Sequence, residues 1–151
     1  MKKYFILMIG FVSFFILTGC SNSNNITNID IQKASSAIDQ KYSNMGDLDD
    51  TQLSVVYKVD VSLMEEHIIK SSSLNNGDFY ALIKVSSKNK KEVQHQMFEM
   101  FRIMEEQSNL YSPEAVTKIQ NRLDTSVGDY LIYFVGDHNS EMYEVLKEYM
   151  E

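Results

Sequence analysis

The spacing of hydrophobic and polar residues divides the chain into an apolar leader, a polar stretch and a long region of periodic patterns. Two basic residues, Lys2 and Lys3, precede a run of 14 mostly apolar residues at positions 4–17. A helix that spans a membrane needs about 20 apolar residues, so this run is too short to be a spanning helix of the mature protein. A basic start followed by about 7–15 apolar residues is typical of a secretory signal peptide.

Five segments after residue 28 carry apolar residues at the spacing of an amphipathic helix. Most of them follow a polar side chain that can accept a hydrogen bond from an exposed backbone N–H of the first turn. The predicted helices are 29–42 after Asn28 or Asp30, 51–57 after Asp49 or Asp50, 90–110, a helix that begins at Ser112-Pro113-Glu114, and a C-terminal helix capped by Asp137.

The pair Asn76-Gly77 predicts a β-hairpin, because both central residues of a type I′ turn need a positive φ. The predicted strands are 66–75 and 78–85, and this register places Ile68 opposite Val85. One face is then a core face, interrupted by Lys70, with Ile68, Leu74, Phe79, Ala81, Ile83 and Val85. The opposite face is mixed, and the register leaves open whether it is covered; it carries His67, Ile69, Ser71, Ser73, Tyr80, Leu82 and Lys84.

A third strand is predicted at 127–135, where six consecutive apolar or aromatic residues occupy positions 130–135. Such a run favours a central strand with both faces covered. The expected fold class is α+β, with a small antiparallel or mixed sheet of at least three strands packed against helices in the order α-α-β-β-α-α-β-α. Residues 29–151 are expected to form one domain, because no repeat and no second domain is evident in the sequence.

The four residues Leu17, Thr18, Gly19 and Cys20 end the apolar run and resemble the lipobox of bacterial lipoproteins. The resemblance implies that the Cys20 thiol receives a diacylglycerol and that a peptidase removes residues 1–19. The mature protein is then held by this lipid on the extracytoplasmic face of the cell membrane, with no other cofactor expected. The alternative is an ordinary cysteine behind an uncleaved anchor. Residues 20–28, rich in Ser and Asn, are expected to be a flexible tether with a reach of about 15 Å.

Charge narrows the possible partners of the mature chain. The leader contains two of the 14 basic residues and none of the 21 acidic ones, so residues 20–151 carry 12 minus 21, a net charge of −9. A domain this acidic is not expected to bind nucleic acid. Because Cys20 is the only cysteine, no intramolecular disulfide can form, and an ordinary hydrophobic core must stabilise the domain.

The sequence lacks the motifs for three kinds of site: a calcium loop, a metal site on a helix and a catalytic or phosphate-binding loop. A calcium loop that began at Asp47 would need glycine at its sixth position and glutamate at its twelfth, but Gln52 and Lys58 stand there. Glu92, His95 and Glu99 share one helical face, yet a second Glu-x-x-His motif is missing, so no metal site is predicted. Neither a Gly-x-Ser-x-Gly elbow nor a phosphate-binding glycine loop occurs, and no catalytic residue is predicted. We therefore do not expect an enzyme.

Several short motifs resemble a family of small bacterial lipoproteins, the DUF4358 lipoproteins. They are the segments 46–53 (GDLDDTQL), 57–60 (YKVD), 78–85 (DFYALIKV) and 128–133 (GDYLIY), and the resemblance extends over about residues 29–151. The resemblance implies an exported, lipid-anchored α+β domain. It implies no activity and no functional residue.

Two functional hypotheses remain. The first is an interaction module that binds an envelope protein or a wall component through the hairpin face with Ser71, Ser73 and Tyr80, because aromatic and hydroxyl groups make orientable contacts. The alternative is an accessory lipoprotein that binds a small solute for a membrane transporter. Its weakness is size, because solute receptors commonly close two domains around a ligand.

Overall fold

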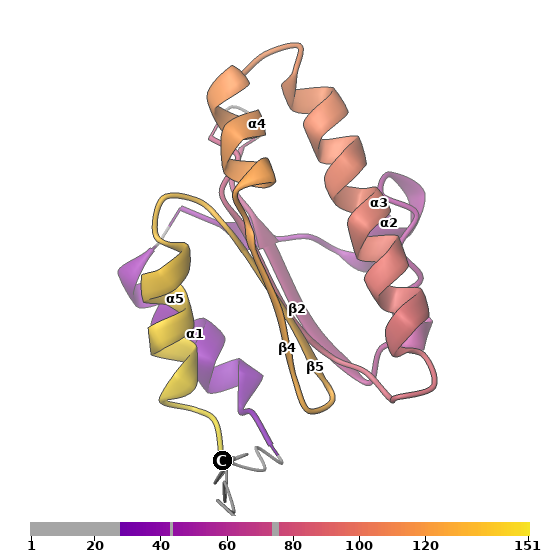
Figure 1. Ribbon diagram of the computed structural model, residues 1–151, viewed down its shortest axis with the longest axis vertical. Coiled ribbons are helices and arrows are strands. Elements are labelled where there is room, and N and C mark those ends of the chain that lie inside the picture. Colours follow the sequence, from indigo (N-terminus) through magenta and orange to yellow (C-terminus); the bar gives the residue numbers. More distant parts are fainter. Residues whose placement is uncertain (1–27, 43, 74–75) are drawn as a thin grey trace, which may run out of the picture.

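Five antiparallel strands form one sheet in the computed structural model, which describes residues 28–42, 44–73 and 76–151 (Figure 1). The order across the sheet is β1-β2-β3-β5-β4. β3 and β5 pair over their full length, from Phe79 opposite Val135 to Lys84 opposite Tyr130. The strands are β1 (Gly46–Asp47), β2 (Glu66–Ser71), β3 (Phe79–Lys84), β4 (Leu123–Val127) and β5 (Tyr130–Val135).

Helices cover both faces of the sheet (Figure 1). α1 and α5 lie together over one face, and α3 and α4 lie over the other. α2 and the short 3₁₀ helix η1 lie between β1 and β2 in the sequence. The bounds are α1 (Ile31–Lys41), α2 (Asp50–Val55), η1 (Val61–Leu63), α3 (Lys90–Ser108), α4 (Pro113–Gln120) and α5 (Asn139–Lys147).

Alternate residues of β3 and β5 point into two separate cores, because successive side chains of a strand point to opposite faces. Phe79, on β3, packs with α3, α4 and α2 on one side, and its neighbour Tyr80 packs with α1 and α5 on the other. All six residues of β5 are buried. The prediction of a late strand with two covered faces is therefore confirmed for β5.

Capping side chains fix where the helices begin. Asp30 accepts a bond from Lys33 N, Asp49 forms a capping box with Gln52, and Ser112 accepts from Ala115 N. These three predicted helix starts are confirmed. The predicted cap of the C-terminal helix was wrong: the N-cap of α5 is His138, without a side-chain cap bond, because the carboxylate of Asp137 binds Lys118 instead.

The predicted register of the first hairpin was wrong. Ile68 lies opposite Leu82 instead of Val85, a shift of three residues. Because the shift is odd, it exchanges the faces of β2, so Ile69 joins the core of Phe79 while Ile68 packs on the side of Tyr80. Of the predicted mixed face, Tyr80 and Leu82 of β3 are covered by α1 and α5, whereas Ile69 of β2 lies in the opposite core.

The loop between β2 and β3 explains the shift. Ser71 is already opposite Phe79, so the two strands are joined by the segment between these residues and not by Asn76-Gly77 alone. Backbone N–H groups of Asn76 and Gly77 donate to Ser73 O, and Ser72 Oγ accepts from Asp78 N. Asn76-Gly77 therefore does turn the chain, but inside a longer loop whose side-chain bonds set the register.

A second hairpin was not predicted. The segment expected as one strand at 127–135 is β5 preceded by β4, and the two-residue turn Gly128-Asp129 joins them. Gly128 has φ +53°, as a turn with glycine at its first central position requires. The α+β class is confirmed, but the element order differs from the prediction because β1 and β4 are additional strands.

The two ends of the described chain lie side by side. Asn28 N donates to Glu151 O at 3.3 Å, Glu151 N donates to Asn28 O at 2.9 Å, and Ile29 forms an isolated bridge with Met150. The C-terminus marks one end of the molecule in Figure 1, and the connection between α3 and α4 lies at the opposite end. In the part of the chain that the structure describes, no helix combines the length and apolar character needed to cross a membrane.

Gly77→Ala tests the close approach of the β2–β3 loop to α4. Gly77 has φ +73°, and an added Cβ would lie 2.6 Å from Ala115 Cβ. We expect the free energy of unfolding to fall by about 2 kcal/mol or more, because the variant combines a left-handed backbone with a steric clash. Urea denaturation measures this loss.

Gly46→Ala is the matched control, because nothing lies within 4 Å of its added Cβ. We expect its free energy of unfolding to stay within about 0.5 kcal/mol of the parent. Equal losses in both variants would contradict the interpretation of the loop contact.

Candidate functional site

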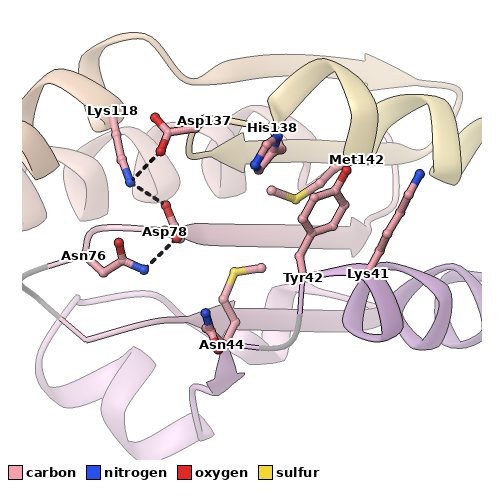
Figure 2. Close-up of a pocket in the computed structure, with 10 residues that line it drawn as sticks. Lys41, Tyr42, Asn44, Asn76, Asp78, Lys118, Asp137, His138 and Met142 are labelled. Carbon is pink, nitrogen blue, oxygen red and sulfur yellow. Dashed lines mark hydrogen bonds and ion pairs between the residues drawn. The ribbon is translucent and has the colours of Figure 1, made fainter.

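A cavity of about 360 Å³ opens where the β2–β3 loop, the end of β5 and the start of α5 meet (Figure 2). Its volume lies within the range of about 300–1,000 Å³ that is common for small-molecule sites. One wall is polar and consists of Asn76, Asp78, Lys118 and Asp137. The other wall mixes rings, thioethers and polar groups, and consists of Lys41, Tyr42, Asn44, Met45, His138 and Met142.

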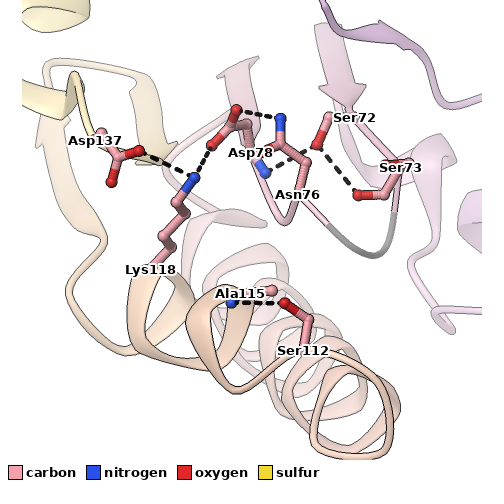
Figure 3. Close-up of polar contacts among 8 residues, drawn as sticks. All are labelled: Ser72, Ser73, Asn76, Asp78, Ser112, Ala115, Lys118 and Asp137. Atoms are coloured by element: carbon pink, nitrogen blue, oxygen red, sulfur yellow. Dashed lines mark hydrogen bonds and ion pairs between the residues drawn. The ribbon is translucent and has the colours of Figure 1, made fainter.

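Lys118 is the centre of the polar wall. Its side chain is only 9% exposed, and Nζ lies 3.1 Å from Asp78 Oδ1 and 3.1 Å from Asp137 Oδ2 (Figures 2 and 3). Burial alone lowers the pKa of the Lys118 ammonium, but its hydrogen bonds to Asp137 and Asp78 outweigh this effect and raise the pKa above 10.5, its ordinary value. Lys118 is therefore a charged, structurally held ammonium.

The pairing of β3 with β5 brings the two carboxylates together. Asp78 directly precedes β3, and Asp137 follows β5 after Gly136. Because the two strands are antiparallel, both aspartates lie at the same end of this strand pair. Asn76 Nδ2 donates to Asp78 Oδ2 at 2.7 Å, so both oxygens of Asp78 have partners. Gly136 keeps this arrangement open, since an added Cβ would lie 3.1 Å from Asp78 Oδ1.

Two stacked rings form the second wall. The rings of Tyr42, after the end of α1, and His138, before the start of α5, lie 5.2 Å apart at 29°. Met142, one turn into α5, is buried beside them, and Lys41 is the last helical residue of α1. Figure 2 shows Lys41 on the opposite side of the cavity from Asp78, Asp137 and Lys118. The cavity therefore has charged groups on both sides and an apolar middle.

The predicted interaction face does not exist as one surface, and this is a second consequence of the wrong register. Tyr80 is fully buried, with its hydroxyl 2.8 Å from Ser35 Oγ and donating to Asp39 Oδ1 at 2.9 Å. Burial raises the pKa of the Tyr80 phenol, so this hydroxyl stays protonated. Ser71 is paired with Phe79 and lies on the other face of the sheet, while Ser73 is exposed in the loop. Tyr80 therefore holds α1 to the sheet.

The other sequence candidates have local roles. Glu92 accepts from Gln96, and Glu99 accepts from Arg102, both within α3. In the described ranges, no group of three or more His, Cys, Asp or Glu side chains could hold a metal ion. Leu17, Thr18, Gly19 and Cys20 lie outside the described residues, so the lipobox stays a prediction.

Sequence reasoning missed the Lys118 cluster. The available signal was weak: Gly-Asp occurs four times in the sequence, and two of these pairs, Gly77-Asp78 before β3 and Gly136-Asp137 after β5, belong to the cluster. Had the antiparallel pairing of these strands been known, both aspartates would have been placed at one end of the strand pair. Lys118 gave no signal of its own, because a single lysine in an amphipathic helix is mostly exposed to solvent.

Together, the fold and the cavity define an α+β domain with an antiparallel sheet between two helical layers and a small polar cavity at one end of the strands β3 and β5. The chain belongs to the family described as Domain of unknown function (DUF4358), whose model matches residues 37–136. Asp78 and Lys118 lie inside the matched region, and Asp137 and His138 follow directly after it. The family resemblance is thereby confirmed, and the match indicates no activity. Neither curated proteins nor solved structures give a match.

Lys118→Met tests the ion-pair cluster. We expect the free energy of unfolding to fall by about 1–3 kcal/mol near neutral pH, because two carboxylates lose a buried partner. The folded pKa of Lys118 is raised, so its contribution is fully present below pH 10.5 and is lost as the pH rises through the folded pKa. The difference between the parent and Lys118→Met should therefore narrow above pH 10.5 in urea unfolding.

Lys88→Met is the control, since Lys88 is exposed in the turn before α3. It should change the free energy of unfolding by no more than about 0.5 kcal/mol at any of these pH values. A Lys118→Met deficit that stays constant through the alkaline range would contradict the role assigned to the ammonium.

Proposed function

We propose that this protein is a lipid-anchored binding module on the extracytoplasmic face of the cell membrane, with no catalytic activity of its own. Its partner is an envelope protein or a wall component. The support for the anchor comes from the sequence: Lys2 and Lys3, the apolar run at 4–17, and a lipobox that ends in Cys20. A diacylglycerol there supplies two acyl chains and gives stable attachment, whereas one chain alone binds marginally.

The position of Asn28 relative to the cavity is the observation that carries this proposal. Asn28 Oδ1 accepts a hydrogen bond from Tyr130 OH at 2.8 Å, at the first residue of β5, whereas Asp137 follows the end of the same strand. β5 has six residues, so the two places are separated by about 20 Å of strand. A tether attached at Asn28 would hold one end of the domain at the lipid and present the cavity away from it.

Exposed apolar residues support a protein-binding role. Leu110 and Tyr111 are 76% and 71% exposed in the connection between α3 and α4. This connection lies at the end of the molecule opposite the C-terminus and Asn28 (Figure 1). Exposed aromatic residues are enriched at the centres of protein interfaces. The anchored domain would therefore present its most exposed apolar side chains away from the lipid, toward a partner in the envelope.

A binding role agrees with the chemistry of the cavity. Because the Lys118 pKa is raised, the amine stays protonated near neutral pH and has no lone pair for nucleophilic attack. It offsets one of the two negative charges of Asp78 and Asp137. The net charge of −9 after removal of the leader disfavours a nucleic-acid partner.

A second candidate function is an accessory lipoprotein that binds a small solute for a membrane transporter. The cavity favours it, because about 360 Å³ accommodates a small solute and polar groups are placed on both sides. The two candidates differ in what the cavity contacts: a free solute, or a group that belongs to a larger partner.

Cys20→Ser tests the anchor. We expect the variant to be released from the membrane fraction or retained as an unprocessed precursor, because serine offers no thiol for the diacylglycerol. Fractionation of cells and mass measurement of the protein check this. A variant that is processed at the same position and remains in the membrane fraction would overturn the lipobox interpretation.

Photo-crosslinking tests the direction of binding. A photoreactive phenylalanine at Tyr111 should give one reproducible adduct in intact envelopes, because this exposed residue lies in the connection between α3 and α4, at the end of the molecule opposite the C-terminus. The same substitution at Glu148, exposed near the C-terminus, is the matched control and should not give that adduct. Identical adducts from both positions, or none from Tyr111, would count against an interaction module of this orientation.

A further inference from the structure

We infer that the cavity binds a small zwitterion, such as a free α-amino acid or a short peptide with both ends free. This inference rests on the proposed binding function and names the chemistry that the cavity selects. It is carried by the distribution of charge over the two walls and by which charged atoms already have partners.

The two walls of the cavity carry opposite charge. Asp78, Asp137 and Lys118 share the polar wall and sum to −1, while Lys41 adds +1 on the opposite side (Figure 2). The charges of these lysines and aspartates therefore sum to zero over the cavity but are separated across it. A ligand with a single charge can pair with only one of the two walls. A zwitterion can satisfy both walls at once.

The charged atoms of the cavity that still lack a partner indicate where the ammonium and the carboxylate of the ligand bind. Asp137 is 69% exposed, and its described contacts use only Oδ2, so Oδ1 can accept from a ligand ammonium. Asp78 cannot do so, because both of its oxygens are already bonded. Lys41 has no ion-pair partner in the part of the chain that the structure describes, and its ammonium can bind a ligand carboxylate.

The middle of the cavity suits a short apolar side chain. The stacked rings of Tyr42 and His138 form one surface, and Met45 and Met142 add flexible thioethers that adapt to different shapes. The volume of about 360 Å³ limits the ligand to a small molecule or the end of a chain.

Methionine-methyl NMR on the full chain in detergent micelles tests this inference with defined probes. Alanine and dialanine carry both charges, alaninamide carries only the ammonium, and N-acetylalanine carries only the carboxylate. We expect saturable shifts of the Met45 and Met142 methyl signals with alanine or dialanine. Met97 and Met100, buried in the core on the other side of the sheet, should not shift and serve as internal controls. The two singly charged probes should bind at least about 10-fold more weakly.

Asp137→Asn supplies the matched variant, because it removes one charge at nearly constant size. It should weaken alanine or dialanine binding at least about 10-fold while the Met97 and Met100 signals stay in place. Glu141→Gln, an exposed neutralisation in the first turn of α5, should leave binding unchanged.

Three results would overturn the inference: no saturable shift of Met45 and Met142 up to about 50 mM of either zwitterion, equal binding of N-acetylalanine, or an unaffected Asp137→Asn variant. These results are separable from failure of the proposed function. The photo-crosslinking at Tyr111 requires no added ligand, so an oriented adduct without zwitterion binding would retain the interaction module and reject only this ligand class.

Discussion

The antiparallel pairing of β3 with β5 is the constraint on which the rest of the structure depends. It joins residues about 50 positions apart, and both strands are buried along nearly their whole length. Because their side chains alternate between two faces, each strand contributes to two cores, and each core needs its own helical layer. The same pairing places Asp78 and Gly136 at one end of the two strands. One strand register therefore determines both the packing of the core and the position of the charged cavity.

Local sequence signals were sufficient to predict most of the helices and strands, because capping and burial patterns act within a few residues. Asp30, Asp49 and Ser112 each accept a bond from the backbone N–H three residues later, and these helix starts were predictable. The register of β2 was not, because it depends on Ser72 and Asp78 bonding across the loop. β4 escaped prediction because its pattern is weak: three polar residues, 124–126, separate Leu123 from Val127.

The candidate site required contacts that no local pattern contains. Lys118 meets a carboxylate 40 positions before it and another 19 positions after it, and neither distance corresponds to a helical or strand period. The Tyr80 error has the same origin. Its hydroxyl belongs to a buried network with Ser35 and Asp39, which only the packing of α1 on the sheet reveals. The sequence pattern separates buried from exposed positions within each helix or strand. It does not show which helices cover which face of the sheet.

The pair of backbone bonds between Asn28 and Glu151 has a mechanical consequence. If the chain is pulled at Asn28 by an anchored tether, the load meets two sets of contacts at once: the bonds to Glu151 with the neighbouring bridge between Ile29 and Met150, and the hydrogen bond that Tyr130 OH donates to Asn28 Oδ1. Tyr130 is the first residue of β5, an interior strand of the sheet. Traction at the membrane would therefore be divided between the C-terminal residues and the sheet.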